Sequence, residues 1–499
     1  MLFNSWNFIF IFLPITFGLY FLANRMKLAR LGKAWLTLAS LIFYGHWNPR
    51  YIPLILLLIL FNFGIGTRLA KSASAADTTA DNASGGAARS GIRSRKTLLV
   101  CGITVNLAVL AYFKYANFFV ENFNALSGWT LALPNVVLPL AISFFTFQKI
   151  AYLVDCHSGR VKDKDLLNYS LFVLFFPQLI SGPIVHYREM MPQFRSLRNL
   201  AIRHQNIFNG LYIFGLGLFK KVILADSFAL WANAGFNSQQ PLDFLFAWAT
   251  SLSYTFQLYF DFSGYCDMAI GAALLFNIRL PINFNSPYQA LSIQDFWRRW
   301  HITLSNFLRD YLYIPLGGNR HGAPRTGLNL SITFLLGGLW HGASWMFVIW
   351  GGLHGLALIV HRLWSARGLR LPKPLAWAAT FFFVNFAWIF FRAHDMAAAL
   401  RVIRGMFSLN IDLASQTAHL PTAMLAWAGY AADRYGDVII LLAYLSIALA
   451  FGIVSRRNSI ELMNDRIGLK KSLSGAAILV VGLYATIAAP SKVFLYFNF

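Results

Sequence analysis

Long apolar runs recur from one end of the chain to the other and constrain its fold more than any other feature. The clearest cover residues 6–23, 51–66, 98–119, 375–391, 437–455 and 472–490. A helix needs roughly 20 apolar residues to cross a bilayer. Charged residues make up only 12% of the chain, against roughly a quarter in soluble domains. The sequence therefore predicts an all-α polytopic membrane protein with about 10–13 hydrophobic segments.

Two segments do not fit a simple row of spanning helices. In residues 177–200, two prolines and a glycine interrupt what would otherwise be an apolar helix. Residues 281–326 mix arginine and aspartate with aromatic side chains, which makes them too polar to span and too aromatic for a free loop. Non-helical backbone at membrane depth survives only inside protein or beside a water-filled cavity. We therefore expect re-entrant or interfacial elements inside the helix bundle.

The net charge of +23 is interpreted as a topology signal rather than as a sign of nucleic-acid binding. Basic residues gather in short loops around residues 25–33, 89–96, 160–164, 367–373 and 456–471. Such loops stay in the cytoplasm, so both termini are predicted outside. The whole chain, 1–499, is expected to form a single transmembrane domain. Its low-complexity residues 72–97 read as a flexible cytoplasmic linker.

His341 is the first candidate for catalysis, because it lies in GGLWHGASWMFVIWGGLHG (337–355), a segment that looks like a span. Ionisable groups at membrane depth are costly and usually functional. A buried imidazole rests neutral and accepts a proton, which suits a general base. The neighbouring glycines, Gly337, Gly338 and Gly342, are expected to permit close backbone approach and to leave room for a substrate chain. The alternative is a core histidine bonded to a neighbouring helix.

Two further histidines are weighed beside it. His301, in FWRRWHITLS, is either a second catalytic group or part of an aromatic and basic anchor at the membrane interface. His354 follows His341 by thirteen residues. On one continuous helix that places it about 20 Å away, roughly on the opposite face. The two histidines could share a substrate only if the helix breaks, which Gly351 and Gly352 allow but do not require. We therefore assign His354 to packing.

Other chemistry is sparse in the sequence. The three cysteines, Cys101, Cys156 and Cys266, form no metal or disulfide pattern, and no zinc or phosphate-loop motif occurs. No metal site is predicted. Asp261 and Asp267 lie in an apolar context and are candidate ion or proton sites. They keep open the alternative of a transporter or polysaccharide exporter without acyl chemistry.

Seven stretches, in chain order, carry a family resemblance. They are ISFFTFQKIAYLVD (142–155), FFPQLISGPIVHYREMMPQF (175–194), YFDFSGYCDMAIGAALLFNIRLPINFNSPY (259–288), FWRRWHITLSNFLRDYLYIPLGGNR (296–320), GGLWHGASWMFVIWGGLHG (337–355), FVNFAWIFFRA (383–393) and FLYFNF (494–499). With them the chain resembles the membrane-bound O-acyltransferases, in particular the bacterial alginate and peptidoglycan O-acetyltransferase branch. The resemblance implies a ring of helices around a central tunnel, with His341 catalytic and His301 as a second histidine.

The resemblance also implies an activity. An acetyl group would pass from a cytoplasmic donor, acetyl-CoA, across the bacterial inner membrane for O-acetylation of a cell-surface polysaccharide, with no bound cofactor. Alginate, peptidoglycan and other exopolysaccharides remain open as acceptors. The expected partners are membrane lipid and a separate periplasmic transferase or esterase-like protein. D-alanyl transfer from a carrier protein is an alternative within the same enzyme class.

The C-terminal motif 494–499 offers one more candidate, Tyr496. The simpler interpretation is an aromatic belt at the outer interface. The motif also resembles the end of the short membrane partner used in teichoic-acid D-alanylation, in which a tyrosine is proposed to carry the acyl group. A phenol has an ordinary pKa of about 10 and needs a base to act as a nucleophile. We therefore expect Tyr496 to accept acetyl beside His341 and to present it to the outer partner.

Overall fold

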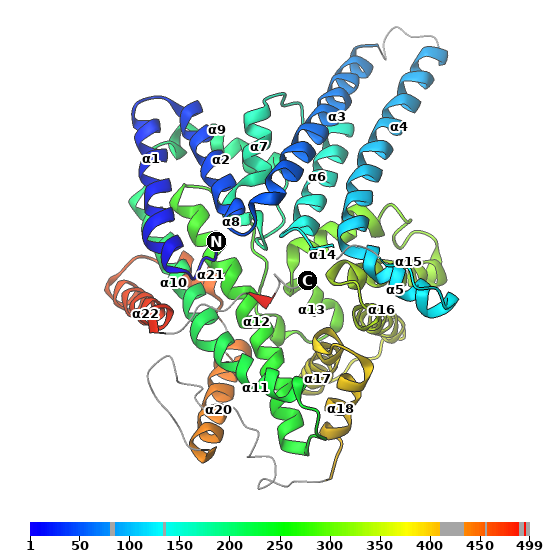
Figure 1. Ribbon diagram of the computed structural model, residues 1–499, viewed down its shortest axis with the longest axis vertical. Helices are drawn as coiled ribbons and strands as arrows, with labels where there is room; N and C mark the ends of the chain where they lie inside the picture. Colours follow the sequence, from blue (N-terminus) through cyan, green and yellow to red (C-terminus); the bar gives the residue numbers. More distant parts are fainter. Residues whose placement is uncertain (80–84, 133–135, 410–433, 455–456, 489–493, 496–499) are drawn as a thin grey trace. The chain divides into compact units, whose positions relative to one another are not determined.

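The computed structural model describes residues 1–79, 85–132, 136–409, 434–454, 457–488 and 494–495 (Figure 1). Over these ranges the chain is almost entirely helical and contains no β-strand. Seven helical segments within them are long and apolar enough to cross a membrane: 7–25, 49–72, 94–127, 204–237, 345–366, 373–392 and 469–488. The prediction of an all-α, multi-pass membrane protein is confirmed.

The described residues form two compact units. The first comprises residues 1–3, 7–210 and 272–281, and the second comprises residues 4–6, 211–271 and 282–499. Helices α10 (His204–Phe219) and α12 (Phe244–Leu275) each contribute residues to both units. The single domain expected from the sequence stays a prediction.

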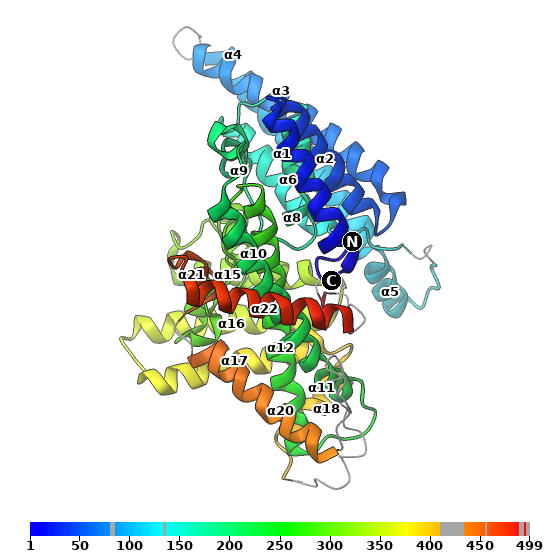
Figure 2. The same cartoon turned by 90° about the vertical axis from the view of Figure 1, so that its left-hand side faces the viewer.

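The first unit is a bundle built around α6 (Figures 1 and 2). Its helices are α1 (Leu13–Arg25), α2 (Ala29–Gly45), α3 (Ile52–Thr79), α4 (Gly85–Leu110), α5 (Ala116–Ser127), α6 (Ile142–His157), α7 (Leu166–Leu174), α8 (Phe176–Leu179) and α9 (Tyr187–Arg195). Helix α6 packs against α3 and α4 and is buried on nearly every side. Its apolar residues lie on every face, as expected of a helix in a core, although Gln148, Lys149 and Asp155 are buried with them.

Helices α3 and α4 extend further than the sequence suggested. The predicted linker, 72–97, is helical over 72–79 and 85–97, while residues 80–84 lie outside the described residues. Alanine is frequent in this stretch, and alanine has the highest intrinsic helix propensity. A segment that lacks apolar residues for a core can therefore still continue two spanning helices.

The expected interruption between residues 177 and 200 is present. Helix α7 ends at Leu174, the one-turn helix α8 follows, and the chain is then non-helical until α9 begins at Tyr187. Residues 175–185 are all buried. The backbone breaks inside protein, as the cost of unsatisfied peptide groups in lipid requires.

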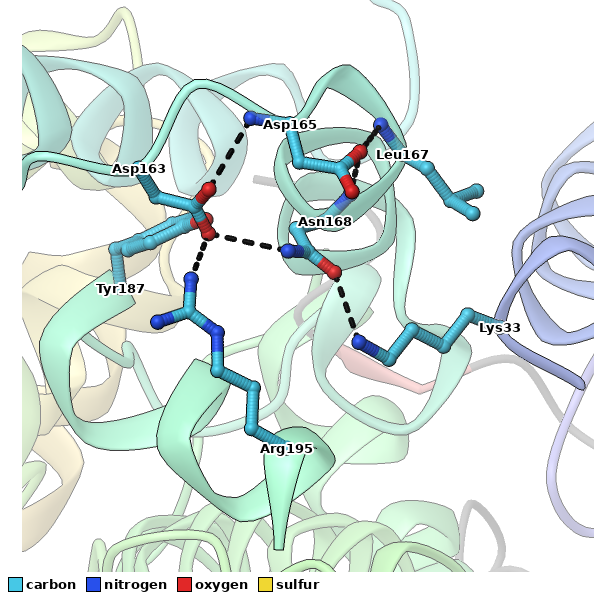
Figure 3. Close-up of polar contacts among 7 residues, drawn as sticks. All are labelled: Lys33, Asp163, Asp165, Leu167, Asn168, Tyr187 and Arg195. Carbon is cyan, nitrogen blue, oxygen red and sulfur yellow. Dashed lines mark hydrogen bonds and ion pairs between the residues drawn. The ribbon is translucent and has the colours of Figure 1, made fainter. Parts of the chain in front are cut away.

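A polar network holds the segment before α7 against α9 and α2 (Figure 3). The carboxylate of Asp163 accepts hydrogen bonds from the Tyr187 hydroxyl, the Arg195 guanidinium and, at 3.1 Å, the Asn168 side-chain amide. Lys33 donates to the Asn168 oxygen at 3.0 Å. The Asp163 carboxylate thus connects the segment before α7 to α9 directly and to α2 through Asn168.

These contacts predict a pH-dependent stability. Burial alone would raise the pKa of Asp163, but the hydrogen bonds from Tyr187, the Asp165 backbone and Asn168, together with the charge of Arg195, lower it. A carboxylate with a lowered pKa stabilises the fold above its unfolded pKa of about 3.9, and this contribution is lost as the pH falls through the lowered value.

We therefore expect Asp163→Asn to lower the free energy of unfolding at neutral pH by about 1–3 kcal/mol, the range for hydrogen bonds to charged groups. Thermal unfolding in detergent between about pH 3 and 7 measures it, and the variant's curve should be flatter over the acidic end of that range. Glu189→Gln, an exposed carboxylate on α9, is the matched control. Equal unfolding temperatures for Asp163→Asn and wild type would contradict the prediction.

The second unit contains the histidine segments. Its helices are the last part of α10, the π-helical turn η5 (Lys220–Ala225), α11 (Asp226–Asn237), α12, α13 (Ile293–Arg299), α14 (Ile302–Leu308), α15 (Gly322–His341), α16 (Trp345–Ala366), α17 (Lys373–Arg392), α18 (Met396–Met406), α20 (Arg434–Leu449), α21 (Ser459–Asn464) and α22 (Leu469–Ala488). Helices α15 and α16 form an antiparallel hairpin, and α17 packs beside α16 (Figure 1).

Candidate active site

His341 is the last residue of α15, at the tip of the hairpin. The helix stops there because Gly342 is extended, and the Ser344 hydroxyl caps α16 by accepting from the Met346 N–H at 3.2 Å. The expectation of one continuous helix through 337–355 was wrong. Three residues, Gly342 to Ser344, suffice to reverse the chain, and a hydropathy pattern does not register so short a break.

Gly338 and Gly342, beside His341, permit the close approach within the hairpin that the sequence predicted. The room for a substrate chain that was also expected is not found at these two glycines. A Cβ on Gly338 would lie 2.2 Å from the Phe347 carbonyl oxygen, and one on Gly342 would lie 2.1 Å from the Phe347 ring. A Cβ on Gly351 would meet the Phe334 carbonyl oxygen at 2.3 Å. The space that these residues leave is filled by the facing helix.

His301 lies at the junction of α13 and α14, fully buried, which excludes the interfacial anchor considered from the sequence. Its φ of +43° falls in the left-handed region. For a residue other than glycine this conformation costs on the order of 1–3 kcal/mol and persists only where the surroundings impose it. Asn283 contributes to imposing this conformation on His301, because its backbone carbonyl accepts a hydrogen bond from the Ile302 N–H at 3.0 Å.

Asn283 also orients the His301 ring. Its side-chain oxygen lies 3.1 Å from His301 Nδ1 and accepts from the Thr303 N–H at 3.2 Å and the Thr303 hydroxyl at 3.0 Å. An amide oxygen only accepts, so the ring must carry its proton on Nδ1. Nε2 is then the nitrogen with the lone pair. Burial lowers the pKa of His301 to about 3, which keeps this ring neutral.

The rings of His301 and His341 lie together, with their centroids 6.5 Å apart. His341 is 4% exposed. Its ring centroid lies 4.9 Å from Trp340, 5.2 Å from Trp350 and 5.1 Å from Phe391. The structure thus brings two histidines, forty residues apart in the sequence, into one cluster of aromatic side chains. Proton transfer within such a cluster would be shielded from water.

His354 is fully buried and packs against the same aromatic cluster, in agreement with the packing role expected from the sequence. Its Nδ1 accepts a hydrogen bond from the Trp297 indole N–H at 3.2 Å. Its ring lies 4.9 Å from Trp350, so Trp350 stands between the two histidines of the hairpin. The hairpin therefore brings His354 much nearer to His341 than a continuous helix would.

A cavity of about 550 Å³ lies in the second unit, and neither His301 nor His341 lines it. It is lined by residues of α13, α14, η7 (Arg309–Tyr313), α15 and α16, including Ile302, the residue after His301. Three arginines reach it: Arg298, Arg309 and Arg362. Arg309 is engaged by Asp310 at 2.7 Å. The arginines suit an anionic ligand, because guanidinium groups bind phosphate and carboxylate oxygens in pairs.

Asp261 and Asp267, the candidate ion sites, are each paired with a lysine. Lys221 Nζ lies 2.6 Å from Asp261, and Lys220 Nζ lies 2.7 Å from Asp267. Neither lysine was among the residues predicted from the sequence. A signal was present, because two lysines inside an apolar helix need buried acids as partners. Asn283 was overlooked as well, and nothing in its local sequence indicates that it orients His301.

Tyr496 lies outside the described residues, so its place relative to His341 stays a prediction. Within the described part of the chain, no group of three or more His, Cys, Asp or Glu side chains is arranged to hold a metal ion.

Buried histidines and an arginine-lined cavity, in a chain with several helices able to span a membrane, are compatible with a membrane-embedded transferase. Comparison with known proteins places the chain among such enzymes. The profile of the membrane-bound O-acyltransferase family matches residues 157–396, which include both histidines.

Relatives extend the likeness over the full length. The chain is 44% identical to the peptidoglycan O-acetyltransferase of Helicobacter pylori, covering 100% of this chain and 98% of that protein. It is 40% identical to the probable alginate O-acetylase AlgI of Pseudomonas aeruginosa, over 82% of this chain and 75% of that protein. The teichoic acid D-alanyltransferase of Streptococcus thermophilus is 30% identical over 47% of this chain and 59% of that protein. The chain belongs to the membrane-bound O-acyltransferase family, and it is an acyltransferase.

The site predicts a role for Asn283 in activity. Asn283→Ala removes the acceptor for His301 Nδ1 and for Thr303, so we expect the His301 ring to lose its orientation and acyl transfer to fall roughly tenfold or more. The rate of acyl transfer by purified protein is the measurement. Asn283→Asp keeps an acceptor oxygen and should retain more activity than the alanine variant. Equal rates for wild type and the alanine variant would show that His301 needs no such support.

Proposed function

We propose that this protein is an O-acetyltransferase of the bacterial inner membrane. It would take acetyl from acetyl-CoA on the cytoplasmic side and deliver it across the membrane for O-acetylation of a cell-surface polysaccharide such as alginate, peptidoglycan or another exopolysaccharide. The observation that carries the proposal is the buried pair of His301 and His341, 6.5 Å apart, in a chain that is 44% identical end to end to a peptidoglycan O-acetyltransferase.

His341 acts in this proposal as the general base. It removes the proton from an acceptor hydroxyl while the oxygen attacks the thioester carbonyl of the donor. The new C–O bond forms, the C–S bond breaks, and the proton passes to the departing thiolate. His301, held neutral with Nε2 as its accepting nitrogen, orients the reacting groups or relays that proton. The surrounding tryptophan and phenylalanine rings exclude water, which would otherwise hydrolyse the thioester.

The arginine-lined cavity supports a coenzyme A thioester as donor. Coenzyme A carries several phosphates, and Arg298 and Arg362 line the cavity together with Ile302, the residue after His301. Both termini are proposed to lie outside and the basic loops in the cytoplasm, on the distribution of lysine and arginine.

Tyr496 is proposed to carry the acetyl group between the two sides. Its phenol oxygen, deprotonated by His341, would attack the donor thioester and form an aryl ester, releasing the thiol of coenzyme A. A periplasmic transferase or esterase-like partner would then move the acetyl to a polysaccharide hydroxyl, which restores the phenol. Tyr496→Phe keeps the ring and removes only the nucleophile, so it separates this role from that of an aromatic anchor.

The transporter alternative receives less support, because Asp261 and Asp267 each lie in an ion pair with a lysine. Radiolabelled acetyl-CoA supplied to purified protein discriminates the two: acyl consumption that depends on His341 excludes a pure transporter. D-alanyl transfer from a carrier protein would regain support if acetyl-CoA failed to bind, since a D-alanyltransferase is among the relatives.

The first test concerns the base. His341→Ala should abolish polymer acetylation, a loss of at least about a hundredfold for removal of a general base, while protein remains in the membrane at wild-type level. Acetyl ester content of the polymer in a strain carrying the variant is the measurement. His46→Ala, an exposed histidine at the end of α2, is the control. Wild-type acetylation in the His341 variant would refute the assignment.

The second test concerns the donor. Arg298→Gln and Arg362→Gln should each raise the KM for acetyl-CoA roughly tenfold or more, because each removes a charged hydrogen bond to phosphate, and should leave kcat nearly unchanged. Arg325→Gln, exposed on α15 and outside the cavity, should leave both constants at the wild-type value. An unchanged KM in both arginine variants would place the donor elsewhere.

A further inference from the structure

The two described residues of the C-terminal motif, Phe494 and Leu495, contact the same buried ion pair. The Leu495 N–H donates to Asp261 Oδ2 at 2.9 Å. The Phe494 side chain is 1% exposed, and its ring lies under Lys221, with Nζ 4.8 Å from the centroid. The edge of Tyr265, one turn along α12 from Asp261, packs against the same ring at 4.6 Å. A charge, a backbone hydrogen bond and an aromatic pair thus converge on a two-residue segment.

The hydrogen-bond acceptor at this site is the Asp261 carboxylate, which shares a single lysine with a second carboxylate, Asp226. Lys221 Nζ lies between two acids, 2.6 Å from Asp261 Oδ1 and 2.8 Å from Asp226 Oδ1. Lys221 and Asp261 are both 2% exposed. One lysine cannot saturate two carboxylates, so Asp261 keeps an acceptor oxygen that needs a donor in a dry environment. The Leu495 N–H supplies that donor.

Two glycines hold the helices close enough to form this acceptor. A Cβ on Gly217 of α10 would lie 2.5 Å from the Gly264 carbonyl oxygen on α12, and one on Gly264 would lie 2.7 Å from the Gly217 carbonyl oxygen. The chain then enters the π-helical turn η5, from which Lys220 reaches Asp267 and Lys221 reaches Asp261. π-helical turns inside helices frequently mark functional sites.

If residues 494 and 495 only packed against the helices, apolar partners would suffice, and the charged pair of Lys221 and Asp261 would not be needed. Buried ion pairs carry a desolvation cost that apolar residues of similar size avoid, so their presence calls for a role beyond stability. We propose that the Lys221–Asp261 pair is a docking site for this chain's own C-terminal segment. By holding the backbone at Leu495, it fixes the position from which Tyr496 starts, since adjacent Cα atoms are about 3.8 Å apart.

Docking deepens the proposed function, and only its consequence for acetyl transfer rests on the Tyr496 relay. In that scheme Lys221 and Asp261 are positioning residues, because they touch the backbone that carries the nucleophile and not the reacting atoms. A phenol on an unanchored tail would seldom lie within reach of the base, whereas an oriented group gains much of its rate from position alone.

The test uses the N–H itself. Leu495→Pro removes the donor, because proline has no backbone N–H, and leaves Asp261, Asp226 and Lys221 intact. Leu495→Ala is the matched control, since it removes the side chain and keeps the N–H. Amide hydrogen exchange of the C-terminal peptide, measured by mass spectrometry on purified full-length protein, reports docking directly. Polymer acetylation in cells reports its consequence.

We expect exchange in residues 496–499 to be roughly tenfold faster in Leu495→Pro than in Leu495→Ala, the change associated with losing one hydrogen bond to a charged group. Polymer acetylation should fall by a similar factor. Equal exchange in the two variants would overturn the docking site. Faster exchange with wild-type acetylation would uphold docking and refute the relay, so the two failures are distinguishable.

A second pair of variants tests the acceptor. Asp261→Asn keeps an oxygen that accepts the Leu495 N–H, and Asp261→Ala removes it. In both, Lys221 retains Asp226. If docking matters, the asparagine variant should keep slow exchange and most of the acetylation, while the alanine variant behaves like Leu495→Pro. If the asparagine variant kept slow exchange but lost acetylation, the negative charge of Asp261, and not docking of the segment, would be what acetylation requires.

Discussion

Gly338 and Gly351 bring the backbones of α15 and α16 into contact, and the position of His341 depends on that contact. A side chain at either glycine would meet a carbonyl oxygen of the facing helix at little more than 2 Å. The two helices can therefore reverse within three residues and leave His341 at the tip. The same hairpin places Trp350 against His341 on one side and His354 on the other. A site held by packed helices rather than by loops keeps the precision that proton transfer requires.

His301 reaches this hairpin by a different route. It directly precedes the short helix α14, has a left-handed conformation and is held by Asn283, eighteen residues earlier. The strain of that conformation and the three contacts to one amide oxygen belong together, because neither is stable alone. The result is a neutral ring with a defined tautomer facing the His341 ring. Two unrelated supports, a glycine contact and an asparagine, thus converge on one pair of imidazoles.

The lack of water in an apolar interior governs the remaining polar groups. Lys220 and Lys221 meet Asp267 and Asp261. The interrupted backbone after α7 is wholly buried. In each case a group that water would otherwise satisfy finds its partner in protein. The terminal segment follows the same rule, because the N–H of Leu495 completes the acceptor of Asp261. Buried polar groups in this protein therefore pair with groups on other segments of the chain.

Much of the fold was predictable from the sequence. Apolar runs predicted the spanning helices at 7–25 and 373–392, and prolines and glycines predicted the interruption after α7. These features are local, since length, apolarity and backbone restriction belong to neighbouring residues. The hairpin at Gly342 was missed, because a break of three residues hardly changes an average over eighteen. The glycines were expected both to permit close backbone approach, which the hairpin shows, and to leave room for a substrate, where the facing helix lies instead.

Within the candidate site, the sequence by itself singled out two histidines: His341, because an imidazole at membrane depth is unusual by its type alone, and His301, because of the family resemblance. Their catalytic roles stay a prediction. Only the tertiary structure decided that their rings lie 6.5 Å apart, that Asn283 sets the tautomer of His301, and that lysines neutralise Asp261 and Asp267. These facts depend on the approach of helices far apart in the chain. Hydrogen bonds and ion pairs act over about 3 Å, and no periodicity in a sequence reports such a distance between segments that packing alone brings together.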